Sequence, residues 1–163
     1  MNILCYGDSN TRGYEPNVEG YSKDAVAEYY PVDMCWWYPL ARGNKLTVNG
    51  LCGRCINKEN KWLPNRNASL DIEKTIQNQE NIDIVILQLG TNDCKSSFNS
   101  SAEEITNAMR DFITQIKKHT NAKIILLSPA RIMENNKITQ KYYKGAQLKS
   151  EQLDMLYKYL ADD

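Results

Sequence analysis

Short apolar stretches along the chain predict four β-strands, at residues 2–6, 45–48, 82–89 and 123–127. Each stretch is followed by polar or glycine-bearing residues, which are typical of turns. The third and fourth stretches, IDIVILQL and KIILL, are nearly continuous in Ile, Val and Leu. We expect these two strands to be buried on both faces, as strands are in parallel sheets.

Apolar residues that repeat at intervals of three and four predict helices in two other parts of the chain. The first helix begins at Ser101 and Glu104, which have the spacing of a capping box, and continues with a regular apolar face. The second covers residues 147–160. Residues 65–80 also predict a helix, although few of their positions are apolar, whereas residues 15–32 are rich in tyrosine and have no clear period.

Strands and helices therefore alternate, which predicts an α/β fold with a parallel sheet and right-handed crossovers. A chain of 163 residues is long enough for one domain with a substantial core. The sequence contains no repeat and no linker, so we expect a single domain over residues 1–163. In an open parallel sheet, ligands bind beyond the carboxyl ends of the strands. The turns that follow the four strands are therefore the place to look for chemistry.

The charge balance and the cysteine content indicate which partners and which cell compartment the protein is expected to have. The 20 basic and 20 acidic residues cancel, which argues against a nucleic-acid partner or an anionic membrane surface. No stretch is apolar for long enough to span a bilayer or to form the core of a signal peptide. Five scattered cysteines, an odd number, are typical of free thiols in a reducing compartment. The sequence thus predicts a cytoplasmic protein without a nucleic-acid or membrane partner.

The turns after the first three strands carry residues suited to ester chemistry. Ser9 follows the first strand and is a candidate nucleophile. The negative oxygen of a tetrahedral intermediate needs hydrogen-bond donors. The backbone N–H groups of Ser9 and Gly53 and the side-chain amide of Asn92 are candidate donors, and the missing Cβ of Gly53 lets a substrate approach closely. This chemistry requires no cofactor and no metal.

The candidate residues lie in three short sequence motifs that follow one another along the chain: GDSN at 7–10, NGLCGR at 49–54 and GTND at 90–93. They resemble the first three signature blocks of the SGNH hydrolases, also called GDSL esterases and lipases, and most closely the arylesterase and acyltransferase branch. The segment WWYPLA at 36–41 resembles a helix of that branch. The resemblance covers almost the whole chain.

The resemblance implies a flavodoxin-like three-layer α/β/α sandwich. It also implies a serine esterase or acyltransferase that hydrolyses small carboxylic esters through an acyl-enzyme at Ser9. Ser9, Gly53 and Asn92 would form the oxyanion hole, and Asp8 and Asp93 would support the turns rather than take part in the chemistry.

The sequence differs from the family pattern in the histidine that acts as the catalytic base. Members of the family carry an Asp-x-x-His block after a fifth strand, and residues 1–163 contain no such block. We therefore expect a domain that lacks its last strand and helix, and an impaired enzyme. The lone histidine, His119, follows the helix that precedes residues 123–127 and is expected at the opposite edge of the sheet from Ser9.

Other functions remain open. The chain is alternatively a non-catalytic relative that binds acyl or sugar esters, or that acts only as part of an assembly. A phosphate or flavin binder is less favoured, because no glycine-rich phosphate loop opens a helix. Without a fifth strand, an unpaired sheet edge at residues 123–127 would favour a homo-oligomer.

Three smaller features have structural interpretations. Cys52 and Cys55 have the spacing of a zinc or redox pair, but a structural zinc needs four ligands and no second pair lies near them. We expect Cys52 to fill a turn and Cys5 to be a core thiol. Trp36 and Trp37 are expected to pack a helix rather than to bind substrate.

Overall fold

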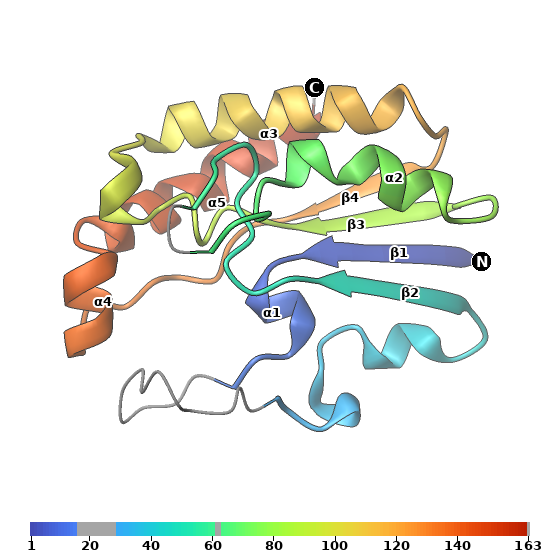
Figure 1. Ribbon diagram of the computed structural model, residues 1–163, viewed down its shortest axis with the longest axis horizontal. Coiled ribbons are helices and arrows are strands. Elements are labelled where there is room, and N and C mark those ends of the chain that lie inside the picture. The colour runs from blue at the N-terminus through green and yellow to red at the C-terminus, as the bar shows by residue number, and fades with distance from the viewer. Residues whose placement is uncertain (16–28, 61–62, 163) are drawn as a thin grey trace.

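A four-stranded parallel sheet forms the centre of the molecule in the computed structural model, which describes residues 1–15, 29–60 and 63–162. The strands are β1 (Asn2–Gly7), β2 (Lys45–Gly50), β3 (Ile84–Gln88) and β4 (Lys123–Leu127). Their spatial order is β2-β1-β3-β4 (Figure 1). The chain therefore moves outward from β1 in one direction and then in the other. In open parallel sheets, ligands bind beyond the carboxyl ends of the strands at such a reversal, here β1 and β3.

Helices and short helical turns lie on both sides of this sheet. The α-helices are α1 (Ser9–Arg12), α2 (Ile72–Gln77), α3 (Ala102–Lys117), α4 (Lys137–Tyr142) and α5 (Ala146–Asp162). The 3₁₀ turns are η1 (Val32–Met34), η2 (Tyr38–Ala41), η3 (Ala68–Leu70) and η4 (Ser96–Phe98). Figure 1 shows α2, α3 and α5 on one side of the sheet, and α1 with the short helical turns that precede β2 on the other. The fold is thus an α/β fold with three layers, as expected.

The alternation of side chains along each strand divides the core into two unequal parts. Leu4 and Tyr6 of β1 point into the larger part, where they pack with the apolar faces of α3 and α5. Ile3 and Cys5 point into a smaller part, which is covered by Trp36, Trp37 and Leu40. Cys5 is fully buried, as the sequence predicted. Trp36 and Trp37 were expected to pack a helix, but they lie in a turn and pack against the sheet.

The two long helices agree closely with the sequence pattern. Helix α3 begins after Ser101, whose side chain accepts a bond from the backbone N–H of Glu104 at 3.1 Å. The Glu104 carboxylate accepts one from the backbone N–H of Ser101 at 2.9 Å. The predicted capping box is therefore confirmed, and so is the final helix, which extends by one or two residues at each end.

Two helical predictions were too long. Within residues 65–80 the chain forms η3 and then α2, which are separated at Asp71. Asp71 accepts hydrogen bonds from Tyr6 and Arg54, and this tertiary role interrupts a regular helix. The segment WWYPLA contains only the four-residue η2, with Pro39 in its first turn. Residues 16–28 of the tyrosine-rich segment lie outside the described residues.

The prediction that β4 is buried on both faces was wrong. Its residues alternate between exposed and half-buried, and Ile125 is 37% exposed. The reason is its position, because β4 is the last strand of the sheet and none of the described residues pairs with its free side. None of the helices formed by the described residues has the length and apolar character needed to cross a membrane.

Candidate active site

The first turn, after β1, holds Ser9 at the start of α1. Asp8 caps this helix, since its Oδ1 accepts bonds from the backbone N–H of Asn10 at 2.9 Å and from Asn10 Nδ2 at 3.0 Å. Ser9 itself is half-buried. Within the described ranges, neither its hydroxyl nor its backbone N–H has a hydrogen-bond partner. Both groups can therefore interact with a ligand.

The second turn, after β2, brings a glycine N–H to the same edge of the sheet. The backbone N–H of Arg54 bonds to the carbonyl of Leu51 at 3.0 Å, which closes a tight turn. Gly53 has φ +81°, a left-handed conformation that favours glycine. Its N–H bonds to none of the residues that the structure describes. A Cβ at Gly50 would lie 2.3 Å from the backbone nitrogen of Arg12, so glycine there lets the second turn pack against α1.

The third turn, after β3, carries a carboxamide that is almost fully buried. Asn92 is 4% exposed. Its Nδ2 donates to the carbonyl of Arg54 at 3.1 Å, and its Oδ1 accepts from the hydroxyl of Tyr143 at 3.3 Å. The carboxamide nitrogen has two hydrogens, so one N–H remains to donate elsewhere. The Oδ1 of Asp93 accepts from the backbone N–H of Ile56 at 3.0 Å, which ties the third turn to the second.

Arg54 joins the turns and is a residue whose role the sequence did not reveal. Its guanidinium is buried and lies 4.1 Å from the centre of the Tyr6 ring. One nitrogen, Nη1, donates to the carbonyl of Gly7 at 2.9 Å and to that of Asn49 at 2.7 Å. The other, Nη2, donates to Asn49 Oδ1 at 2.9 Å and to Asp71 at 3.2 Å. Arg54 therefore fixes the ends of β1 and β2 against each other. A charged residue in a turn is normally exposed to solvent, so the residue type alone gave no sign that Arg54 is buried. The only sequence signal for Arg54 was its place in the motif NGLCGR.

Two buried carboxyl groups lie beneath the turns. Asp8 and Asp93 are at most 2% exposed, and the Oδ2 atom of each has no hydrogen-bond partner among the described residues. Burial raises the pKa of Asp8 to about 6 and the pKa of Asp93 to about 7, and bonds from Asn10 and from the N–H of Ile56 respectively oppose this rise. Both carboxyl groups are occupied in holding the turns.

The structure does not bring His119 to Ser9. His119 follows α3 and lies 4.0 Å from Glu73, measured from Nε2 to Oε2. It lines a polar groove of about 440 Å³ with residues such as Asp83 and Asn121, which precede β3 and β4. These residues mark the amino-terminal edge of the sheet, whereas Ser9 lies beyond the carboxyl end of β1.

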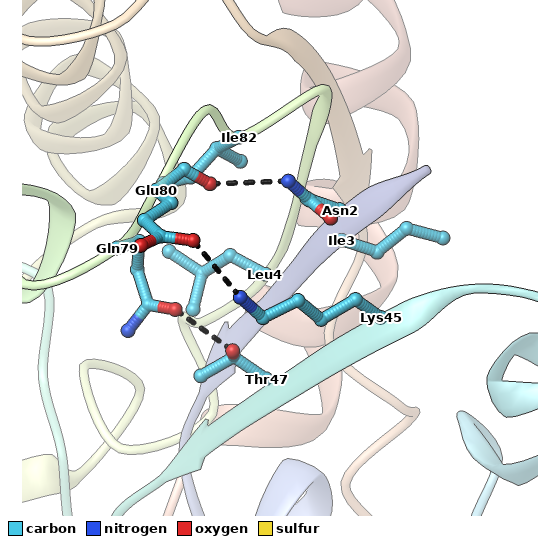
Figure 2. Close-up of a pocket in the computed structure, with 8 residues that line it drawn as sticks. All are labelled: Asn2, Ile3, Leu4, Lys45, Thr47, Gln79, Glu80 and Ile82. Carbon is cyan, nitrogen blue, oxygen red and sulfur yellow. Dashed lines mark hydrogen bonds and ion pairs between the residues drawn. The ribbon is translucent and has the colours of Figure 1, made fainter.

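A second cavity also lies at that amino-terminal edge. Figure 2 shows it between Asn2, Lys45 and Glu80, where Asn2 Nδ2 donates to the backbone carbonyl of Glu80 and the Lys45 ammonium pairs with the Glu80 carboxylate. Its volume is about 10 Å³, which holds at most one water molecule. Neither cavity includes Ser9, Gly53 or Asn92.

The cysteines form no pair and no metal centre in the described part of the chain. All five are free thiols. Cys55 is fully buried, and its Sγ donates to the carbonyl of Gly53 at 3.6 Å, whereas Cys52 is half-buried in the turn. No group of three or more His, Cys, Asp and Glu side chains among the described residues could hold a metal ion.

The parallel four-stranded sheet with helices on both sides matches the structures of SGNH hydrolases. Residues 5–163 match the GDSL-like lipase/acylhydrolase family, and the chain belongs to that family. No curated protein gives a significant match.

Solved structures of esterases have the same fold. The native aryl esterase of M. smegmatis is 26% identical, with a TM-score of 0.89 over 99% of this chain and 79% of that one. Est24, a carbohydrate acetylesterase from Sinorhizobium meliloti, is also 26% identical, with a TM-score of 0.86 over 99% of this chain and 79% of that one. The chain thus corresponds to about four fifths of the length of these enzymes.

Proposed function

We propose that the protein is a serine esterase or acyltransferase that cleaves small carboxylic esters through an acyl-enzyme at Ser9. The support for this proposal is a set of hydrogen-bond donors in the three turns, at the same edge of the sheet as Ser9. The N–H groups of Ser9 and Gly53 have no partner among the described residues, and Asn92 keeps one spare N–H. Three turns joined by buried hydrogen bonds hold these donors in place.

The chemistry follows from the types of group present. Ser9 Oγ attacks the carbonyl carbon of the ester and forms a new C–O bond, while the π electrons of the carbonyl move to its oxygen. The donors stabilise that oxyanion. The hydroxyl proton of Ser9 passes to solvent water as the C–O bond forms. The intermediate then collapses, the bond to the alcohol oxygen breaks, and that oxygen takes a proton from solvent and leaves as the alcohol. Water or a second alcohol subsequently takes the acyl group from Ser9.

Among the described residues, no base is placed to take the Ser9 proton. No side chain in the described part of the chain bonds to the Ser9 hydroxyl, and His119 lies at the opposite edge of the sheet. In serine hydrolases that lose one member of the triad, the oxyanion hole and substrate binding still give about 10³ to 10⁴-fold over water. We therefore expect residues 1–163 to act slowly on esters.

The substrate class that we propose is a small acyl ester of an aryl or sugar alcohol. The support is the likeness to an aryl esterase and to a carbohydrate acetylesterase, both 26% identical.

Hydrolysis of an aryl acetate by the purified 163-residue chain tests the proposal. We expect slow turnover that Ser9→Ala abolishes and that Ser97→Ala, a change of an exposed serine, leaves unaltered. His119→Ala should also leave the rate unchanged. Equal rates for the wild type and Ser9→Ala would show that Ser9 is not the nucleophile. A rapid wild-type rate that His119→Ala removes would contradict the assignment of the histidine.

The unpartnered Ser9 hydroxyl also favours a second function, an ester-binding protein without turnover. Equilibrium binding of the same aryl acetate distinguishes the two functions. Saturable binding together with hydrolysis no faster than that of Ser9→Ala would support the binding protein and reject the esterase.

A further inference from the structure

Tyr143 lies next to the third turn although no sequence motif marked it. It follows α4 and is half-buried against the main core. Its backbone N–H donates to the carbonyl of Thr139 at 2.8 Å, and its own carbonyl accepts from the N–H of Ala146 at the same distance. Its hydroxyl reaches Asn92 Oδ1 at 3.3 Å. The backbone of Tyr143 is therefore fixed independently of Asn92.

The end of α4 is also attached to the residues that follow Asn92. Ser96 Oγ donates to the carbonyl of Tyr142 at 3.1 Å. The Lys95 ammonium lies 5.7 Å from the centre of the Tyr143 ring, within the range of a cation–π contact. These contacts hold the tyrosine beside the carboxamide.

The hydrogen bonds of Asn92 determine which way its carboxamide faces. The carbonyl of Arg54 can only accept, so the atom that faces it must be Nδ2. Oδ1 then faces Tyr143, and the tyrosine hydroxyl must be the donor. A planar amide held at its oxygen and at one N–H has its second N–H in a fixed direction. Donation to Oδ1 also polarises the amide and strengthens that N–H as a donor.

We propose that Tyr143 is a positioning residue of the oxyanion hole, whose hydroxyl orients Asn92 so that the free N–H faces the developing oxyanion. This inference rests on the proposed function, because it assumes that Asn92 meets the oxyanion. Tyr143 does not touch the reacting atoms and acts through Asn92.

Tyr143→Phe removes the hydroxyl and keeps the ring in the core. Loss of a whole oxyanion donor costs about 10² to 10³-fold in kcat, so loss of its orientation should cost less. We expect kcat for an aryl acetate to fall about tenfold with little change in KM. The matched control is Tyr142→Phe, which changes the adjacent, exposed tyrosine at the last position of α4 and should leave both constants unchanged.

A double-mutant cycle with Asn92→Ala separates positioning from a general effect on stability. If Tyr143 acts through Asn92, Tyr143→Phe should have no further effect on kcat once Asn92 is alanine. An unchanged kcat in Tyr143→Phe, or a full effect in both backgrounds, would overturn the inference.

Two further measurements distinguish a failure of the Tyr143 inference from a failure of the proposed function. Equal rates for the wild type and Ser9→Ala would reject the function itself, and with it the catalytic role of Tyr143. The NMR signals of the Asn92 side-chain amide, identified by their loss in Asn92→Ala, report the hydrogen bond without any turnover. They should shift in Tyr143→Phe and not in Tyr142→Phe, and unchanged signals would show that the hydroxyl does not orient Asn92.

Discussion

Asp8 and Asp93 place two carboxyl groups in the interior, where ionisation is unfavourable. Burial raises the pKa of Asp8 to about 6 and that of Asp93 to about 7. The pKa of an aspartate in an unfolded chain is about 3.9. An acid with a higher pKa in the folded state holds its proton more tightly when folded. Its contribution to stability is therefore fully present below the unfolded pKa and is lost as the pH rises through the folded pKa.

We expect the free energy of unfolding of the wild type to decrease as the pH rises from about 4 to about 7. In the Asp93→Asn variant this decrease should be smaller. Each unit of difference between the folded and unfolded pKa values is worth about 1.4 kcal/mol, and asparagine keeps the Oδ1 acceptor while removing the charge. Urea unfolding at pH 5 and pH 8 measures the effect. Asp111→Asn, at an exposed position of α3, is the control and should follow the wild type. Stability that rises with pH in the wild type would contradict this account.

At the scale of elements, sequence pattern was most reliable where one periodic face and one cap coincided. The Ser101–Glu104 capping box located the start of α3 to within a residue, and the apolar face identified it as a helix. The pattern was less reliable where contacts distant in sequence compete with local preference. Asp71 interrupts the predicted helix at 65–80 because it accepts bonds from Tyr6 and Arg54. Helix α4 was not predicted at all, since its six residues carry little periodicity.

Ser101→Ala should destabilise the protein by about 1 kcal/mol, the usual cost of removing an N-cap side chain. The reason is that the backbone N–H of Glu104 loses its acceptor at the start of α3. Chemical denaturation measures the difference. Ser101→Asp keeps an acceptor at the cap and should retain most of the stability, so an equal loss in both variants would show that the cap is not the cause.

At the scale of the whole molecule, the free side of β4 is the least protected part of the sheet. Its backbone donors and acceptors on that side pair with no described residue, and Ile125 exposes 37% of its surface. Unpaired apolar edges attract further strands. We propose that the homo-oligomer expected from the sequence forms through this edge.

Ile125→Lys should therefore reduce self-association, because a charge on an edge strand opposes pairing. Light scattering coupled to gel filtration would show a larger average mass for the wild type, which increases with concentration, and a mass closer to the monomer for the variant. Leu70→Lys changes a residue that is 79% exposed outside the sheet and serves as the control. A wild type that stays monomeric at every concentration would refute the proposal.

The sequence by itself determined the α/β class, the positions of the strands and the three turns that carry Ser9, Gly53 and Asn92. These features depend on neighbours in the chain, namely apolar runs, glycine turns and caps, so a single sequence records them. The alternation of strands and helices also predicted that His119 lies at the opposite edge of the sheet from Ser9, and the structure confirms it. Only the tertiary structure decided that Arg54 joins the turns and that Tyr143 faces Asn92. Those relations depend on which segments the strand order β2-β1-β3-β4 brings together, and such contacts join residues too distant in sequence to leave a local pattern.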